Sequence, residues 1–331
     1  MPARVRRKPF FSLLAAALVV LATAGAAAAT NGGFTPEAPH SPNAHKITSA
    51  YYLILGFTGF IFVVVEGLLV LFVWRYRSRG RAREVEGPQV HGHTRLELMW
   101  TGAPIVLLAV IAGFVFYELP GIDKAPAATD PIHITVEGHQ FYWQFDYPNG
   151  AHSINDLHVP VGQVVDLRVV SADVIHSWWI PSLGGKIMAI PGRTNHTWFK
   201  ADTTGTFQGQ CAELCGVYHA SMLADVTVDS ASAYHAFLTK TAGPTLGKQI
   251  FTGVCATCHG MQGQGGYGPT LSSSPLLTSR SSLVQILRHG QDTSRPGIMP
   301  AVGSTWSNAE IDALAGYVKK SVYKGASASG G

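Results

Sequence analysis

The chain has 331 residues, enough for two or three domains. Hydrophobic residues make up 47% of it and the mean hydropathy is +0.17, too apolar for an ordinary soluble enzyme. The formal net charge is +4, but the arginines are concentrated at the N-terminus and in one loop, so the charge does not indicate a nucleic-acid-binding protein. We therefore expect part of the chain to lie in a membrane.

The first 29 residues have the pattern of a secretory signal. Four basic residues lie between positions 4 and 8, an apolar run follows over 10–21, and the small-residue tract TAGAAAAT comes next. This order is typical of a cleavable signal peptide, so we predict cleavage near Ala29. An uncleaved membrane anchor is the alternative, which the short apolar run disfavours. Residues 30–46 would then begin an exported N-terminal segment.

Two long apolar segments follow, and we predict that residues 30–120 hold the exported segment and a transmembrane hairpin with helices at about 51–74 and 98–118. Each apolar run is as long as the roughly 20 residues that a membrane-spanning helix needs. The loop between them has five arginines over 75–83, which by the positive-inside bias places it in the cytoplasm. A carboxylate inside a membrane is costly, so Glu66 in the first helix indicates a functional or paired group.

Residues 121–230 change to alternating and β-branched patterns, for example HITVEGHQFYWQFDYP and HVPVGQVVDLRVVSA, separated by Pro, Gly and Asn turns. This pattern predicts a small antiparallel β-sandwich without a helix longer than a turn or two. The aromatic residues Phe141, Trp143, Phe145 and Tyr147 occupy alternate positions, so they share one strand face and most should be core.

Residues 231–325 have helical periodicity at both ends and a middle rich in Gly, Pro and Ser, which predicts a compact all-α domain. Residues 326–331 would be a disordered tail. The predicted fold is therefore multi-domain, with a two-helix hairpin, an all-β sandwich and an all-α domain in that order.

The four cysteines form two pairs, and the second lies in CATCHG. The CxxCH spacing lets the thiols of Cys255 and Cys258 attach covalently to haem, while His259 reaches the iron as an axial ligand. A redox-active disulfide is the alternative, which the lack of a surrounding βαβ pattern disfavours. The second axial ligand should come from downstream. Met299 in GIMPAVG is well placed for that, whereas Met261 is too close to fold over the opposite haem face.

This region resembles class I c-type cytochromes over residues 244–324. The shared features are an opening helix, CxxCHG, the Gly268–Pro269 turn, the GIMP loop and a closing helix. The resemblance implies that Pro269 helps to orient His259.

The first cysteine pair lies in QCAELCGVYHASM, where Cys211, Cys215, His219 and Met222 fall within twelve residues. Their spacing of four, four and three also fits one stripe of a helix, and an oxidising compartment would permit a disulfide. Glycines and strand-like flanks favour a loop instead, and these side chains suit copper better than zinc. A further ligand must come from elsewhere, and His176 in SADVIHSWWIP is the best candidate.

The segments DVIHSWWIPSLGGKIMAIPGRTNH and QCAELCGVYHASM resemble the binuclear copper (CuA) signature of cytochrome c oxidase subunit II, and the likeness extends over about residues 45–230. The resemblance implies a cupredoxin-like fold for residues 121–230. It also implies six copper ligands: the bridging thiolates of Cys211 and Cys215, one imidazole per copper from His176 and His219, the Met222 thioether on one copper, and the Glu213 backbone carbonyl on the other.

Three further positions follow from the same resemblance. The Glu213 carboxylate would bind magnesium at the interface with the catalytic subunit, the alternative being a solvated loop acid. Glu97 in LELMWTGAP would lie at the entrance of a proton path, or else only mark the membrane boundary. The family usually has Trp at the position of Phe141 as the entry point for electrons from soluble cytochrome c. This departure weakens that route, and the fused haem domain, tethered at an effective concentration of about a millimolar, offers a replacement.

The expected function is the electron-input subunit of a haem-copper terminal oxidase in a bacterial inner membrane, with the copper and haem domains on the periplasmic side. Its expected partners are oxidase subunits I and III, and a cytochrome c or an upstream respiratory complex as donor. The chain lacks a histidine-bearing helix bundle, so oxygen reduction would occur in subunit I. A CuA-containing nitric oxide reductase could use the same modules. A copper-delivery assembly protein would instead have a thioredoxin fold and no haem, and a quinol oxidase subunit would lack Cys211 and Cys215.

Overall fold

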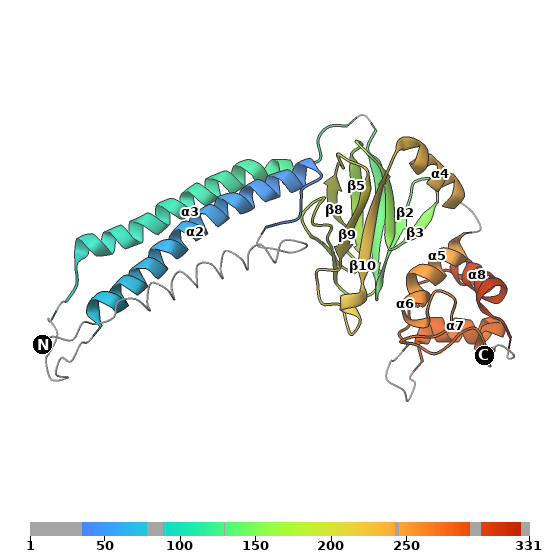
Figure 1. Cartoon of the computed structure of the whole chain (residues 1–331). Helices are drawn as coiled ribbons and strands as arrows, with labels where there is room; N and C mark the ends of the chain where they lie inside the picture. Colours follow the sequence, from blue (N-terminus) through green and yellow to red (C-terminus); the bar gives the residue numbers. More distant parts are fainter. Residues whose placement is uncertain are drawn as a thin grey trace, which may run out of the picture.

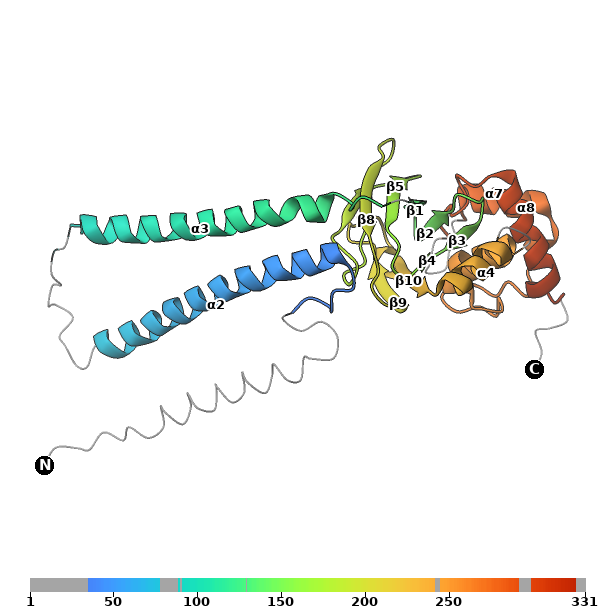
Figure 2. The ribbon, with the colours of Figure 1, turned by 90° about the horizontal axis from the view of Figure 1, so that it is seen from above.

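The computed structural model describes residues 35–77, 89, 91–128, 130–241, 245–291 and 299–325. Three bodies follow one another along the molecule: a long helical hairpin, a β-sandwich and a small helical domain (Figures 1 and 2). The predicted signal peptide at 1–29, the tail at 326–331 and most of the arginine-rich loop lie outside the described residues.

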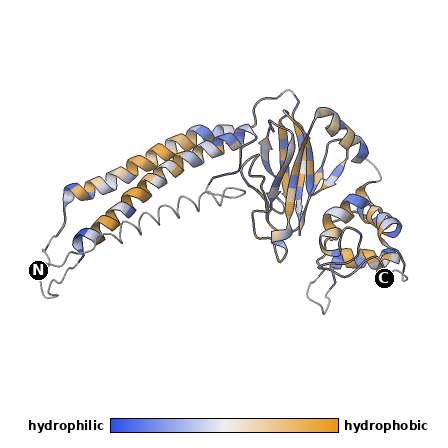
Figure 3. Ribbon diagram, in the orientation of Figure 1, coloured by the Kyte–Doolittle hydropathy of each residue, from blue (hydrophilic) through white to orange (hydrophobic). Residues whose placement is uncertain are grey.

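The hairpin consists of α2 (Pro42–Tyr76) and α3 (Thr94–Asp123), with 35 and 30 residues. Both helices are long and apolar enough to cross a membrane, and their apolar residues dominate the middle of each helix (Figure 3). They extend beyond the predicted bounds of 51–74 and 98–118, which were wrong because hydropathy detects only the apolar middle. The polar ends continue the helices, and an ion pair of 2.6 Å joins Lys46 to Glu118 there.

The ends of the hairpin next to the sandwich are fixed to it by hydrogen bonds. The Asn43 side chain donates to the backbone carbonyl of Trp198 at 2.6 Å, and the Trp198 indole donates to the carbonyl of Ile122 at 2.9 Å. The backbone N–H of His40 donates to the carbonyl of Ser182 at 2.7 Å. Both helices therefore hold the sandwich in a defined orientation.

The sandwich has two main sheets and a short ribbon. The first sheet has the order β3-β2-β1-β5-β8, with β1 (Ile132–His139), β2 (Tyr142–Asp146), β3 (His152–Ile154), β5 (Val165–Ser171) and β8 (Asn195–Phe199). The second has the order β4-β10-β9, with β4 (Asp156–Pro160), β9 (Gly205–Gln210) and β10 (Leu223–Asp229). The ribbon pairs β6 (His176–Trp178) with β7 (Ile187–Ala189).

The predicted all-antiparallel pairing was wrong at two places, because β1 pairs with β5 and β4 with β10 in parallel. These pairs join strands distant in sequence, which a pattern of short strands and turns cannot reveal. The stretch HITVEGHQFYWQFDYP is also not one strand but two, paired antiparallel with Gly138 opposite Trp143. Trp143, Phe145 and Tyr147 are buried in the sandwich core, whereas Phe141 lies at the turn and is half-buried.

The helix α4 (Ala231–Thr241) packs on the sandwich, although we predicted that the α domain begins at residue 231. Tyr234 is part of the sandwich core, and the ring of Phe237 stacks on that of His158 with centroids 3.9 Å apart. The composition changes to helical at residue 231, but the packing changes only after Thr241. The sandwich therefore includes a helix that the sequence pattern assigned to the next domain.

The helical domain follows after residue 244 and has its own core, which includes Phe251, Leu287 and Ile311. The elements of this domain are α5 (Leu246–Ile250), η2 (Phe251–Cys255), α6 (Ala256–His259), η3 (Pro275–Thr278), α7 (Arg280–His289), α8 (Asn308–Tyr317) and η4 (Val318–Val322). Gly247 lies where α5 crosses α8, and a Cβ there would overlap the backbone carbonyl of Ala313, so the close crossing requires glycine.

Candidate functional site

The segment 211–222 is a loop that joins two paired strands, β9 and β10. Its base is closed because the backbone N–H of Cys211 donates to the carbonyl of Met222 at 2.9 Å. Residues 211–218 are not helical, and only the short turn η1 (His219–Ser221) follows them. The single helical stripe that the spacing permitted is therefore wrong.

The thiol of Cys211 is buried among three other candidate ligands. Its Sγ lies 3.9 Å from the Sγ of Cys215, 3.9 Å from Nδ1 of His176 and 3.2 Å from the backbone carbonyl oxygen of Glu213. Both cysteines are free, so the disulfide alternative is not adopted. His176, 35 residues before Cys211, reaches the loop because it begins β6 beside it.

The thiol of Cys215 has the remaining two candidates as neighbours. Its Sγ lies 3.5 Å from Nδ1 of His219 and 3.7 Å from the Sδ of Met222. The turn η1 brings these side chains back toward the thiol, and Met222 is fully buried. The structure thus gathers all six predicted copper-ligand positions around the two sulfur atoms.

The imidazole of His176 is held in one orientation by its surroundings. Its Nε2 lies 2.8 Å from the carboxylate of Asp173, which also accepts backbone N–H groups from Gln140 at 2.7 Å and Val174 at 2.6 Å. A Cβ at Gly138 would lie 2.8 Å from the ring, so the adjacent strand also packs closely on it. Nδ1 is thereby left to face Cys211. Sequence reasoning missed Asp173, although its place three residues before the histidine was a usable signal.

The electrostatics of the two thiols fit a site for a cation. Burial opposes ionisation of Cys211, but hydrogen bonds from His176 and from the backbone of Ser177 outweigh it and lower the pKa of that thiol. Burial and the charge on Cys211 raise the pKa of Cys215. The first thiolate therefore forms easily and opposes the second, a conflict that a metal ion between them would remove. Thiolate, imidazole and thioether are donors that suit copper.

A cavity lies between the cytochrome-like domain and the loop of residues 211–222, which we call the copper loop. Its volume of about 430 Å³ is typical of cofactor sites. The candidate haem residues Cys255, Cys258, His259 and Met299 all line it. The opposite part of its wall comes from the sandwich, namely from Phe141, Val217, Tyr218 and Ser221. Sequence reasoning missed the last three, because nothing in a loop sequence shows which other domain it faces.

The buried imidazole of His259 has a fixed tautomer and packs closely against Gly268. Its Nδ1 lies 2.7 Å from the carbonyl oxygen of Pro269, to which an Nδ1–H donates, leaving Nε2 as the free ligand atom. A Cβ at Gly268 would lie 2.8 Å from the ring, so only glycine permits this position. Two thiols, an available imidazole nitrogen and a thioether around one cavity fit a covalently bound haem.

Three acidic candidates lie apart from these clusters or take another role. Glu97 caps the start of α3 by accepting the backbone N–H of His93 at 3.0 Å. Glu66 is exposed on α2 and pairs with no side chain in the described part of the chain. The carboxylate of Glu213 joins no three-residue cluster of metal-ligating groups among the described residues.

Three family models match the chain. They are the transmembrane domain of cytochrome c oxidase subunit II at residues 29–117, the periplasmic domain of the same subunit at 151–230, and subunit III of cbb3-type cytochrome c oxidase at 242–318. The last match begins where α4 has ended, in agreement with the packing of α4 on the sandwich.

Several characterised proteins are similar along most of the chain. A cytochrome c oxidase subunit 2 from Alkalihalophilus pseudofirmus is 33% identical over 308 residues, covering 85% of this chain and 89% of the relative. The corresponding protein of Cereibacter sphaeroides is 32% identical, covering 64% and 81%. A quinol oxidase subunit 2 from Bacillus subtilis is 30% identical, covering 64% and 68%.

Among solved structures, the periplasmic domain of cytochrome oxidase subunit II from Bradyrhizobium japonicum is 36% identical, covering 36% of this chain and 96% of that one, with a TM-score of 0.34. The matched oxidase and cytochrome domains imply binding of copper and haem, and the two long helices agree with a membrane protein. The chain, which has a C-terminal cytochrome c domain, belongs to the cytochrome c oxidase subunit II family and is a component of a haem-copper oxidase.

Proposed function

We propose that this chain is the electron-input subunit of a haem-copper terminal oxidase. Electrons would enter the cytochrome domain, reach a binuclear copper centre in the sandwich, and leave for the oxygen-reducing subunit I. The observation that carries the proposal is that residues 217, 218 and 221 of the copper loop line the same cavity as Cys255, Cys258 and His259. The two candidate redox sites are therefore adjacent.

The copper ligands would be the six groups around the two thiols. Cys211 and Cys215 would each contribute a thiolate, and His176 and His219 would bind through Nδ1, the nitrogen that faces the sulfurs. The Met222 thioether and the Glu213 carbonyl would complete the set. Asp173 holds the proton on Nε2 of His176 and so keeps Nδ1 available.

The haem would be held by thioether bonds from Cys255 and Cys258, and its iron by Nε2 of His259 and the sulfur of Met299. The Pro269 carbonyl keeps the proton on Nδ1 of His259, and the apolar side chains of Val217, Val254 and Val302 line part of the cavity. When bound, the haem and the copper pair would each accept and release one electron at a time. Because the protein holds these ligand groups in place before the cofactors bind, their positions should change little when an electron is gained or lost.

The remaining expectations are part of the same proposal. Subunits I and III would surround the hairpin, and the donor would be a cytochrome c or an upstream respiratory complex. The Glu213 carboxylate would bind magnesium at the interface with subunit I, and Glu97 would lie at a proton entrance. The sandwich and cytochrome domains would lie on the periplasmic side of a bacterial inner membrane. The copper-delivery alternative is not retained, because the β-sandwich is not a thioredoxin fold.

The test is metal and spectroscopic characterisation of the full chain in its purified membrane complex. We expect two coppers that share one unpaired electron for each covalent low-spin haem, and copper reduction after photoreduction of the haem. A Cys215→Ser variant should lose the copper signal and keep the haem. A single copper, or zinc, would contradict the binuclear site. Supplying oxygen and nitric oxide in turn to the complex distinguishes the terminal oxidase from a nitric oxide reductase.

A further inference from the structure

Tyr142 connects the two redox domains. It begins β2 of the sandwich, yet its side chain is only 1% exposed and packs in the core of the cytochrome domain with Phe251 and Trp306. The Trp306 indole N–H donates a hydrogen bond to the Tyr142 hydroxyl, and the two rings meet edge to face. Burial raises the pKa of Tyr142, so its hydroxyl stays protonated while its oxygen accepts this bond.

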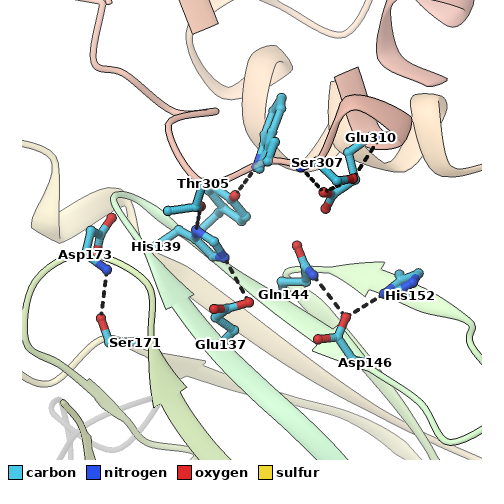
Figure 4. Close-up of polar contacts among 12 residues, drawn as sticks. Glu137, His139, Gln144, Asp146, His152, Ser171, Asp173, Thr305, Ser307 and Glu310 are labelled. Atoms are coloured by element: carbon cyan, nitrogen blue, oxygen red, sulfur yellow. Dashed lines mark hydrogen bonds and ion pairs between the residues drawn. The ribbon is translucent and has the colours of Figure 1, made fainter. Parts of the chain in front are cut away.

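His139 extends the same contact. Its ring stacks on Tyr142, with centroids 4.6 Å apart and an interplanar angle of 4°. Its Nδ1 lies 3.2 Å from the hydroxyl of Thr305 in the cytochrome domain, and its Nε2 lies 3.5 Å from the carboxylate of Glu137 (Figure 4). The histidine is only 5% exposed. Aromatic and polar contacts therefore combine in one desolvated interface, which is typical of binding hot spots.

A second, separate contact prevents rotation about the first. The Asn155 side chain donates to the backbone carbonyl of Gly253 at 2.7 Å and accepts the backbone N–H of Trp143 at 2.8 Å. Asn155 has a φ of 59°, a conformation that asparagine tolerates better than most residues. A Cβ at Gly253 would overlap the side chain of Ile154, so η2 packs directly on β3. Two points of attachment fix both position and orientation.

The fixed orientation places aromatic rings between the two sites. Phe141 directly precedes Tyr142, and its ring contacts Tyr218 of the copper loop edge to face at 5.3 Å. Tyr218 in turn contacts Tyr267 of the cytochrome domain at 5.7 Å. Phe141, Tyr218 and Tyr267 all line the haem cavity. Because Tyr142 directly follows Phe141, its contacts hold this part of the cavity wall beside the copper loop.

The charges of the two domains favour the same association. Residues 130–230 contain ten acidic side chains and four Lys or Arg, whereas residues 245–325 contain three acidic side chains and seven Lys or Arg. Opposite net charges attract the domains but do not select one orientation. The contacts of Tyr142 and Asn155 supply that selection.

We propose that Tyr142 is a positioning residue that locks the cytochrome domain onto the copper domain, so that electrons cross between them through the Phe141–Tyr218 contact without domain motion. This inference rests on the proposed electron route. It implies that the cytochrome domain is docked rather than merely tethered. A soluble donor could not then reach Phe141, and external electrons would have to enter through the cytochrome domain.

The test uses the full chain in its oxidase complex, with two readouts. The first is the rate of haem-to-copper electron transfer after photoreduction, measured at increasing solvent viscosity. The second is amide hydrogen exchange of residues 251–255 and 303–308, which lie at the interface. We expect a native rate independent of viscosity. Tyr142→Ala should reduce the docked-to-undocked ratio on the order of thirtyfold, with faster exchange and a rate that now falls with viscosity.

Two variants separate the causes. Tyr142→Phe keeps the ring stack but leaves the Trp306 N–H without its acceptor, so we expect about a tenfold reduction in the docked-to-undocked ratio. Tyr147→Phe is the matched control, because Tyr147 is also a buried tyrosine, but its hydroxyl bonds within the sandwich to Ser153 and to the backbone N–H of His158. It should leave both readouts at native values.

The outcomes are distinguishable. A native rate that slows with viscosity, or a Tyr142→Ala chain that matches Tyr147→Phe in both readouts, would overturn the lock. If the native complex carries both cofactors but transfers no electron between them, the proposed function fails, while hydrogen exchange still tests the docking by itself. Should Tyr142→Ala fail to fold, Tyr142→Phe with Asn155→Ala weakens both attachments with smaller losses of packing.

Discussion

The close packing of Gly268 on His259 leads to a specific prediction. Gly268→Ala would place a methyl group 2.8 Å from Cε1 and Nδ1 of the imidazole. Ordinary carbon contacts lie at about 3.5 Å, so one of the two groups must move by roughly 0.7 Å. Gly268 itself is pinned, since its backbone N–H donates to the carbonyl of Cys258 at 2.7 Å. We therefore expect the imidazole to move.

The displaced ring would lose its hydrogen bond to the Pro269 carbonyl, a loss of about 1 kcal/mol. The bond sets the ring orientation and the basicity of Nε2, and loss of such a partner typically weakens ligand binding by about 10- to 100-fold. Haem should stay attached through Cys255 and Cys258. Its axial bond to His259 should weaken, and its reduction potential should change.

The assay is a redox titration of the full chain, with absorption and electron paramagnetic resonance spectra of the oxidised haem. Gly316→Ala is the matched control, because Gly316 lies on α8 in the same domain and a Cβ there meets nothing within 4 Å. That variant should be native in both measurements. If Gly268→Ala gives the same spectrum and reduction potential as Gly316→Ala, the packing of Gly268 does not position His259.

Three further predictions concern the ligands and the sandwich. Asp173→Ala should weaken copper binding by about 10- to 100-fold, as measured by copper content during dialysis against a chelator; native retention would show that the carboxylate does not position His176. Met299→Ala should leave the haem covalently attached but change its axial ligation, and an unchanged spectrum would refute this choice of ligand. Stability should also depend on pH through His158: burial lowers its pKa, but hydrogen bonds to Asp156 and Asp229 outweigh burial and raise it. The stabilisation from His158 should be complete below its unfolded pKa of about 6.5 and be lost as pH rises through its higher folded pKa. Burial opposes ionisation of Asp156, but its bonds to His158 lower its pKa, so its stabilisation is lost only as pH falls through that lowered value. Thermal unfolding of the full chain from pH 4 to 9 should therefore flatten in His158→Phe, and an unchanged profile would exclude this cluster as its cause.

Features that depend on local order along the chain could be predicted from the sequence. The CxxCH motif places two thiols and an imidazole close together in the chain, independently of the elements around the motif. The loop of Cys211 and Cys215 likewise carries four donors within twelve residues. The long apolar runs identified both membrane helices, because about 20 apolar residues in succession have few other uses. The resemblance to a known copper signature then singled out His176 for that loop.

Contacts between distant surfaces, in contrast, depend on the folded chain and could not be predicted in this way. The strand pattern could not reveal parallel pairing of β1 with β5, since pairing depends on contacts far apart in sequence. Composition assigned α4 to the wrong domain, because a helix next to helices has the same pattern whichever core it packs on. Tyr142 lies on a strand of the sandwich, yet its ring lies in the core of the neighbouring domain. Alternation shows which side of a strand is apolar, but not what covers it. The docking of the cytochrome domain on the copper loop is therefore a property of the folded chain.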